Sequence, residues 1–181
     1  MNTQIATFGG GCFWCTEAVF RRLKGVLSVL PGYSGGKEPN PSYMQVSMGN
    51  SGYAEVAQIE FDPSVVSFEK LLDVFWVVHD PTTLNRQGND VGTQYRSAIF
   101  YHDDVQRVAA EKSKVTLELS GKYSSPVVTE IAAFQNFYEA DQSHKDYYEK
   151  NRQNGYCRVI IDPKIQKLFK EFAADIDEAK K

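Results

Sequence analysis

The stretch IATFGGGCFWCTEAVF, residues 5–20, joins three kinds of local structure within a short span. Its first part predicts a β-strand at residues 4–8. The run of glycines predicts a tight turn, because glycine reaches backbone angles that other residues avoid. The amphipathic stretch that follows predicts a helix that begins at or just after Cys12 and runs to Lys24. A strand that turns directly into a helix indicates a sheet packed against helices.

The rest of the chain continues this alternation. Three more helices are predicted: one after the N-cap Ser67, one from Asp103 to about Leu119, and one with Asp162 as N-cap and Pro163 at its first position. An apolar stripe in the last of these extends to Ile176. The other predicted strands are residues 26–33, 54–61, 94–101 and 127–134. This order predicts an α+β fold, a two-layer sandwich with a mixed sheet.

The composition is that of an ordinary globular protein, with 42% hydrophobic residues, 24% charged residues and a net charge of −3. Its basic residues are scattered, so no nucleic-acid partner is expected, and the pair Arg21-Arg22 is expected on a helix surface. No apolar run is long enough to span a membrane and no secretory signal is visible. An odd count of three cysteines favours a cytoplasmic protein with reduced or cycling thiols. Residues 1–181 are expected to form a single catalytic domain.

Cys12 stands between three glycines and a predicted helix start. Backbone N–H groups and the positive end of the helix dipole would face its sulfur there and favour the nucleophilic thiolate. The CxxC spacing to Cys15 strengthens a reactive role over simple burial of a thiol. A zinc site formed by Cys12, Cys15, Cys157 and one histidine is the main alternative. Only one close pair of cysteines is present, however, so no metal is expected.

Two aromatic residues and a carboxyl accompany this thiol. Phe13 and Trp14 follow it directly and must point in different directions on a helix, so at least one is expected to line an apolar pocket around the sulfur. Glu55 shares one face of its strand with Ala57, Ile59 and Phe61. Propensity favours solvent for this carboxyl, but in an apolar pocket burial would raise its pKa and keep it protonated. Glu17 and Glu60 are expected to be exposed.

Six motifs resemble those of the A-type peptide methionine sulfoxide reductases and occur in the order typical of that family. They are GCFW at 11–14, GYSGG at 32–36, NPSY at 40–43, GYAEV at 52–56, FW..HDP at 75–81 and RQGNDVGTQYRSAI at 86–99. The resemblance covers roughly residues 5 to 160. It implies an α+β fold related to the ferredoxin-like plait. It also implies reduction of the S epimer of methionine sulfoxide, free or in oxidised proteins, with no bound cofactor.

The resemblance further implies roles for individual residues. Cys12 would be the nucleophile, Phe13 and Trp14 would cage the methyl group of the substrate, and Glu55 would be the acid. Tyr43 and Tyr95 would donate hydrogen bonds to the sulfoxide oxygen, and Asp90 would help to orient this network. These residue types suit the reaction, because a thiolate can attack a sulfoxide only as its oxygen is protonated or strongly hydrogen-bonded.

Loss of methionine would leave a sulfenic acid on Cys12, and a second thiol can condense with it. Cys157 matches the C-terminal cysteine of the family by its GYC context and is favoured as this resolving thiol. Cys15 is adjacent and could close the disulfide instead, and a relay through both also remains open. Thioredoxin is the expected reductant of the disulfide. The protein is expected to act as a monomer.

The chain departs from the family pattern at three places. Cys15 stands where many relatives have glycine, Tyr53 stands where histidine is common, and the tail after Cys157 continues as a helix. Two other function classes remain open: a general CxxC thiol–disulfide oxidoreductase and a zinc-stabilised or methionine-binding module. Fold class alone separates none of them. His79 is expected to have a structural role, and the sequence predicts no function for His102 and His144.

Overall fold

A six-stranded sheet in the order β7-β6-β1-β3-β2-β8 organises the protein, whose computed structural model describes residues 3–180. Its strands are β1 (Gln4–Gly10), β2 (Val26–Ser34), β3 (Ala54–Phe61), β6 (Ser97–Tyr101), β7 (Glu130–Ala133) and β8 (Tyr138–Glu139). Neighbouring strands are antiparallel, except that β7 runs parallel to β6. A separate hairpin joins β4 (Arg86–Gln87) to β5 (Asp90–Val91). The sheet is therefore mixed, as the sequence predicts.

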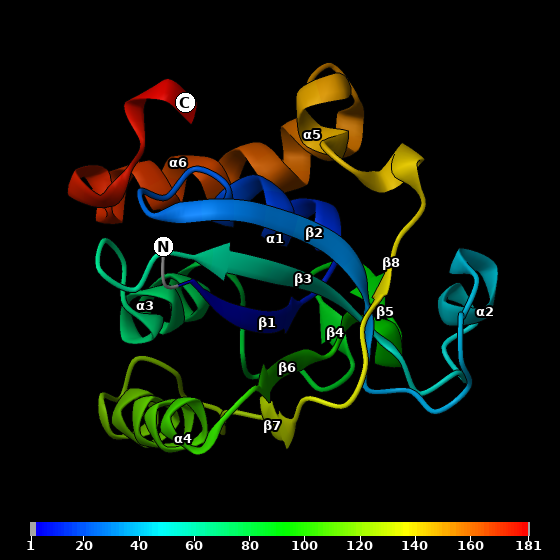
Figure 1. Ribbon diagram of the computed structural model, residues 1–181, viewed down its shortest axis with the longest axis horizontal. Helices are drawn as coiled ribbons and strands as arrows, with labels where there is room; N and C mark the ends of the chain where they lie inside the picture. The colour runs from blue at the N-terminus through cyan, green and yellow to red at the C-terminus, as the bar shows by residue number, and fades with distance from the viewer. Residues whose placement is uncertain (1–2, 181) are drawn as a thin grey trace.

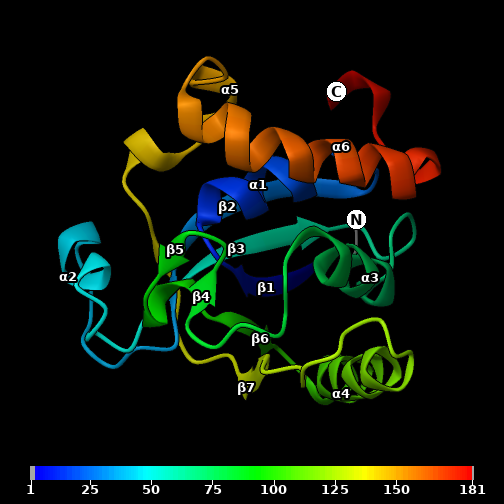
Figure 2. The same ribbon diagram turned by 180° about the vertical axis from the view of Figure 1, so that it is seen from behind.

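The helices gather on one side of this sheet. The longer ones are α1 (Phe13–Phe20), α3 (Phe68–Val78), α4 (Asp104–Leu119) and α6 (Asp162–Glu171), and the short ones are α2 (Tyr43–Ser47) and α5 (Tyr147–Lys150). The strands lie in front of α1 and α3 in Figure 1, and the view from behind in Figure 2 brings these helices forward. Helix α2 stands apart from the sheet in both views. This arrangement confirms an α+β fold.

Side-chain caps set the starts of two helices. The Ser67 hydroxyl accepts a hydrogen bond from the Lys70 backbone N–H at 3.1 Å, and the Asp103 carboxylate accepts one from Gln106 at 2.8 Å. Each cap satisfies a backbone donor that the first turn leaves free. Helices α3 and α4 therefore begin where the sequence predicts.

The ends of other elements differ from the predictions. Helix α1 stops at Phe20 instead of Lys24, because its last turn tightens: the Leu23 N–H bonds to the Phe20 carbonyl three residues back, at 3.1 Å. The predicted strand 94–101 begins only at Ser97, since a 3₁₀ turn occupies Thr93–Tyr95. The predicted strand 127–134 is shortened to β7.

Asp162 is not the N-cap of the last helix, contrary to prediction. A π-helical turn at Cys157–Ile161 runs directly into α6, and Asp162 already has helical backbone angles. Its carboxylate instead accepts a hydrogen bond from the Tyr148 hydroxyl at 2.7 Å. At the other end α6 stops at Glu171, and Ile176 forms an isolated β-bridge with Leu23.

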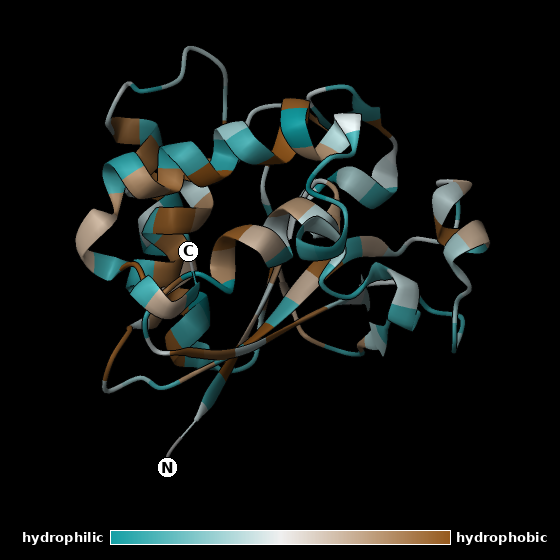
Figure 3. Ribbon diagram, turned by 90° about the horizontal axis from the view of Figure 1, so that it is seen from above, coloured by the Kyte–Doolittle hydropathy of each residue, from teal (hydrophilic) through white to brown (hydrophobic). Residues whose placement is uncertain are grey.

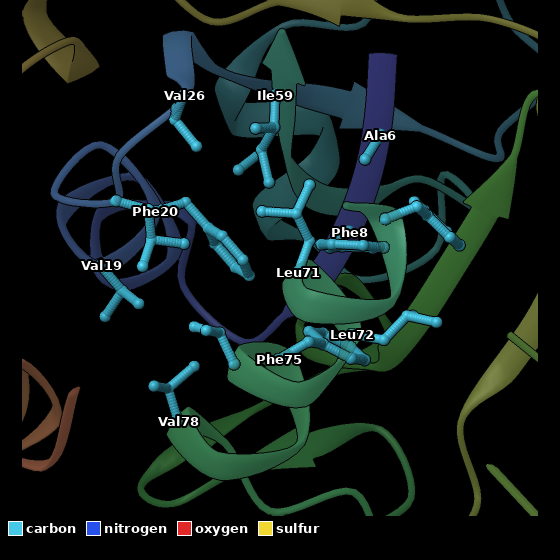
Figure 4. Close-up of a cluster of buried hydrophobic side chains, with 14 of the residues drawn as sticks. Ala6, Phe8, Val19, Phe20, Val26, Ile59, Leu71, Leu72, Phe75 and Val78 are labelled. Atoms are coloured by element: carbon cyan, nitrogen blue, oxygen red, sulfur yellow. The ribbon is translucent and has the colours of Figure 1, made fainter. Parts of the chain in front are cut away.

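The main core lies between the sheet and helices α1 and α3. Phe8 is at its centre, with its ring centroid 5.6 Å from that of Phe20, 5.8 Å from Phe68 and 5.0 Å from Phe75. Figure 4 shows these layers meeting, with Ala6, Phe8 and Ile59 from the strands facing Phe20, Leu71 and Phe75 from the helices. Bands of hydrophobic and hydrophilic residues alternate along the helices in Figure 3, as helices with one buried face require.

A smaller apolar cluster covers the opposite face of the sheet. It consists of the buried residues Ala54, Val56, Ala98 and Phe100, with Ala132, Phe134 and Phe137 packed against them. Both faces of β3 are therefore buried near its start, and Glu55 lies in this buried part.

Arg22 is buried, and the prediction of a surface position is wrong. Its side chain is 2% exposed and donates hydrogen bonds to the Ala18 carbonyl at 2.5 Å and the Glu149 carboxylate at 2.6 Å. Its guanidinium also lies 5.1 Å from the centre of the Tyr148 ring. The cause is the packing of α5 and its surroundings against the end of α1, which turns this helix end into an interior contact. Arg21 is half-buried and pairs with Asp146.

No helix within residues 3–180 is both long enough and apolar enough to span a lipid bilayer.

Candidate active site

Cys12 occupies the N-cap of α1, where β1 delivers the chain to the helix. Gly11 makes this turn with a φ of +93°, and a Cβ at this position would lie 2.6 Å from the Gln87 side chain. Both features require glycine. No backbone N–H of the described helix start donates to the Cys12 side chain.

The Glu55 carboxyl is held directly beside this helix start. Its Oε2 accepts a hydrogen bond from the Phe13 backbone N–H at 3.0 Å. The residue is 2% exposed, and burial raises its pKa from an ordinary 4.5 to about 8 even though this N–H bond lowers it. Glu55 is therefore protonated at neutral pH, and the buried alternative replaces the solvent position that propensity favours.

Cys12 and Cys15 form a thiol pair on the first turn of α1. The Cys15 backbone N–H bonds to the Cys12 carbonyl at 3.1 Å. A hydrogen bond from the Cys12 thiol lowers the pKa of Cys15 to about 7, although burial opposes this. Burial, followed by the Cys15 thiol and the charge of Glu55, raises the pKa of Cys12. Within this coupled pair the proton is favoured on Cys12 and the charge on Cys15, in contrast to the thiolate that the sequence predicts at Cys12.

The Tyr156 hydroxyl links this pair to Asp90. It lies 3.9 Å from the Cys15 sulfur and donates a hydrogen bond to the Asp90 carboxylate at 2.7 Å. Interaction with this phenol lowers the pKa of both Cys12 and Cys15, while burial raises the pKa of Tyr156 itself. Asp90 therefore orients a phenol beside the thiols. The family resemblance implies that Asp90 orients the network of Tyr43 and Tyr95, whereas its hydrogen bond here comes from Tyr156.

Phe13 and Trp14 both lie against His144, with ring centres 5.3 and 5.8 Å from that ring and 6.4 Å from each other, so the two rings do not diverge as the sequence predicts. Phe13 is buried, with its ring 5.7 Å from that of Tyr33. Trp14 is half-buried and stacks on Tyr147 with the ring centres 3.6 Å apart and the planes at 6°. Its indole N–H donates to Nδ1 of His144 at 3.2 Å. The indole is therefore fixed both by stacking and by a hydrogen bond.

Tyr43 and Tyr95 lie near the thiol and the carboxyl. The Tyr43 ring is 4.6 Å from that of His144, and Tyr95 packs against the buried cluster that contains Cys12. Burial raises the pKa of both phenols, and Glu55 and Cys12 raise it further once they are ionised at high pH. Both phenols are therefore neutral at physiological pH and able to donate hydrogen bonds.

Cys157 begins the π-helical turn and is fully buried in the same cluster as Cys12 and Cys15. Burial raises its pKa, and the charges of Asp162 and Cys15 raise it further. All three thiols are free. All three thiols therefore belong to one buried cluster, and the charge of Cys15 acts on the pKa of Cys157.

Comparison with known proteins identifies the family. The family model described as "Peptide methionine sulfoxide reductase" matches residues 4–176. The chain belongs to this family. A relative named "Peptide methionine sulfoxide reductase MsrA", from Sulfolobus acidocaldarius, is 55% identical over 169 residues, which are 93% of this chain and 95% of the relative.

Two solved structures of a yeast protein resemble this reductase. Mxr1 from Saccharomyces cerevisiae in reduced form matches with a TM-score of 0.77 at 36% identity, covering 86% of this chain and 89% of that one. Mxr1 in complex with Trx2 matches with a TM-score of 0.54 at 27% identity, covering 80% and 84%. This chain and yeast Mxr1 therefore share one fold over most of their lengths.

Tyr53, which stands where the family motif is expected to have histidine, has a structural contact. The residue is fully buried, and its hydroxyl donates to the Glu38 carbonyl at 2.5 Å. Its ring fills the space beside Gly36, where a Cβ would lie only 2.2 Å away. Tyr53 therefore fastens the loop between β2 and α2.

Four residues of the site are not predicted from the sequence: Tyr33, His144, Tyr147 and Tyr156. Two signals could have found them. Tyr33 pairs with Glu55 across β2 and β3, so that the two share one face of the sheet. The other three belong to a segment dense in tyrosine and histidine immediately before Cys157, which exceeds what a surface loop needs.

Glu17 and His79 are both buried and hydrogen-bonded. Glu17 is 3% exposed, so the prediction of an exposed charge is wrong; it accepts the Asp146 backbone N–H at 2.9 Å, and burial raises its pKa to about 7. His79 is structural, as predicted: its ring nitrogens bond to the Phe75 carbonyl at 2.5 Å and the Ser97 hydroxyl at 2.7 Å, and burial lowers its pKa to about 3. Within residues 3–180, no group of three or more His, Cys, Asp or Glu side chains could hold a metal ion.

Proposed function

We propose that this protein reduces the S epimer of methionine sulfoxide, free or within oxidised proteins, to methionine by thiol chemistry. The observation that carries the proposal is the buried, protonated Glu55 beside the Cys12–Cys15 pair. A sulfoxide has a strong acceptor oxygen, and its sulfur becomes electrophilic only as that oxygen gains a proton. A general thiol–disulfide oxidoreductase would not need Glu55, Tyr43 and Tyr95 together beside one thiol.

Cys12 is the nucleophile in this proposal. Its proton passes to the Cys15 thiolate along the hydrogen bond between them, and the sulfur attacks that of the substrate. Glu55 gives its proton to the sulfoxide oxygen, which transfers to Cys12 and leaves a sulfenic acid. The methionine sulfur gains two electrons and the Cys12 sulfur loses two.

The aromatic residues orient the substrate. Tyr43 and Tyr95, as neutral phenols near Glu55, donate hydrogen bonds to the oxygen whose charge grows during the attack. Phe13 and Trp14 form the apolar wall against which the methyl group packs. Asp90 acts one step away, by orienting the Tyr156 hydroxyl beside the thiols.

The contacts favour Cys15 as the first resolving thiol, although the sequence context favours Cys157. Cys15 lies one turn from Cys12, with its backbone N–H bonded to the Cys12 carbonyl, so it condenses with the sulfenic acid and releases water. Cys157, which is buried in the same cluster, then attacks the Cys15 sulfur and frees Cys12. The disulfide thereby moves away from the substrate site.

A thioredoxin-type protein is the proposed reductant of this disulfide, supported by the yeast relative that has been solved with Trx2. We also propose that residues 1–181 act as one catalytic domain and as a cytoplasmic monomer. The four central strands, in the order β6-β1-β3-β2, support a relation to the ferredoxin-like plait.

Steady-state reduction of the separate S and R epimers, with dithiothreitol as reductant, tests this function. Methionine should form from the S epimer only, and Cys12→Ser should form none. Glu55→Gln should be slower by about 10²–10⁴-fold, the usual contribution of a general acid. Glu60→Gln is the matched control, because Glu60 lies on the same strand and hydrogen-bonds to Ser28. Equal turnover of both epimers, or activity without Cys12, would refute the proposal.

A further inference from the structure

Two of the three methionines of the chain lie together on helix α2 and at its C-cap. Met44 is 75% exposed and Met48 is 71% exposed, whereas Val46 between them is buried. Residues four apart share a helix face, so the two thioethers project together into solvent. The third methionine, Met1, lies outside the described residues.

The side of helix α2 that carries Met44 and Met48 is accessible. It stands apart from the sheet in Figures 1 and 2 and is held between two loops, one of them carrying Pro39 and Pro41, the other Gly49 and Gly52. A surface cavity of about 370 Å³ lies beside Met48. An added sulfoxide oxygen therefore meets water and open space, so oxidation need not unfold the helix.

Exposed thioethers are the methionines that peroxides oxidise most readily. Hydrogen peroxide transfers one oxygen to the sulfur and leaves as water, so the sulfur loses two electrons and becomes a sulfoxide. Residues 3–180 contain two methionines, Met44 and Met48, and both are exposed to such oxidation. Because it is proposed to work on oxidised proteins, it meets peroxide wherever its substrates form.

We propose that Met44 and Met48 are modification sites, and that their S-sulfoxides are substrates for the Cys12 site of a second copy of this chain. This inference rests on the proposed function and adds a particular protein substrate to it. The exposed side chain enters the other copy without unfolding of α2. Cys12 of that copy takes the oxygen, its thiol pair closes to a disulfide, and the methionine sulfur regains two electrons.

The placement of these residues gives the repair a use. Tyr43, a proposed donor to the sulfoxide oxygen, is the first residue of α2 and immediately precedes Met44. Oxidation of Met44 converts an apolar side chain into a polar one on the residue that follows Tyr43 in this helix. Repair by a second copy restores the helix that carries part of the site.

The experiment separates an acceptor copy from a donor copy. The acceptor is Cys12→Ser, treated with hydrogen peroxide, reduced with dithiothreitol to reopen disulfides, and freed of both reagents. The donor is Met44→Leu/Met48→Leu in catalytic amount with fresh dithiothreitol, since it cannot itself carry sulfoxide at these positions. Peptide mass spectrometry follows the loss of oxygen from the acceptor. Acceptors that also carry Met44→Leu or Met48→Leu assign the loss to each residue.

We expect roughly half of the sulfoxide at each position to disappear, because oxidation gives both epimers and this class of enzyme reduces one. A short peptide with methionine sulfoxide, added to the same reaction, monitors the donor. Persistence of both sulfoxides while the peptide is reduced would overturn the inference and leave the proposed function intact. If the peptide is not reduced either, both the inference and the proposed function are wrong.

Discussion

Neighbouring groups with opposed pKa shifts give the site its chemistry. The Glu55 carboxyl keeps its proton because it is buried, while Cys15 loses its proton more easily because Cys12 donates a hydrogen bond to it. At neutral pH an acid and a thiolate therefore coexist within one buried cluster. Neither state could be read from the residue types, since each depends on which partner lies nearby.

The rate of sulfoxide reduction should fall as the pH rises through about 8, where Glu55 loses its proton. A carboxylate cannot protonate the sulfoxide oxygen, so the alkaline decline reports this one group. The pH profile of kcat/KM for the S epimer measures it. Glu55→Gln should lack the decline and stay slow at every pH. A decline that persists unchanged in Glu55→Gln would assign it to another group.

Tyr156→Phe should make the thiol pair harder to deprotonate. The Tyr156 hydroxyl lowers the pKa of both Cys12 and Cys15, so its removal should shift thiolate formation to higher pH. The thiolate absorbance of the reduced protein, titrated with base, gives the shift directly. Tyr123→Phe is the control, because the Tyr123 hydroxyl bonds to the Trp76 carbonyl instead. Identical titrations of the two variants would contradict this role.

At the scale of elements, side-chain caps make some boundaries predictable and tertiary contacts hide others. Ser67 and Asp103 predict the starts of α3 and α4 as N-cap residues, and both helices begin there. Helix α2 also has such a signal, a capping box between Ser42 and Gln45, which the sequence analysis overlooked. Strand β8 has no local signal, because its two residues are ordered only by pairing with Gly32 and Tyr33.

The contact between α1 and the start of α5 should make stability depend on pH. The pKa of Glu17 is raised from an ordinary 4.5 to about 7 in the folded state. Between these values the folded protein holds a proton that the unfolded chain releases, so this contribution to stability is lost as the pH rises toward 7. Glu17→Gln, which can still accept the Asp146 N–H, should make the decline less steep.

Urea unfolding at a series of pH values measures this effect. Glu118→Gln is the control, because Glu118 is an exposed residue of α4. The control should follow the unmodified protein. The prediction fails if Glu17→Gln and Glu118→Gln show the same dependence of unfolding free energy on pH.

At the scale of the whole molecule, one core should dominate stability. Phe8→Ala should lower the unfolding free energy by about 3–5 kcal/mol, since it leaves a cavity among three other aromatic rings. Ile5→Ala on the same strand should cost about 1 kcal/mol or less, because Ile5 is on the exposed side of β1. Chemical denaturation of both variants gives the comparison. Equal losses would mean that the core is not organised around Phe8.

The sequence predicts the layers of the molecule better than it predicts its charges. The alternation of strands and helices led to the α+β fold, and the motifs selected Cys12 and Glu55, which the fold brings together. The burial of Glu17 and Arg22 was not predicted, because each depends on helix α5, which is distant in the chain. Local pattern cannot show which distant segment will cover a charged side chain.

A single turnover without external reductant tests the central claim most directly. The fully reduced protein is mixed with S-methionine sulfoxide, methionine is counted per chain, and the disulfides are mapped by peptide mass spectrometry. A relay through Cys15 predicts about two methionines per chain with Cys15 bonded to Cys157, and about one in Cys157→Ser with Cys12 bonded to Cys15. Absence of methionine from the reduced protein, or its formation by Cys12→Ser, would contradict the account.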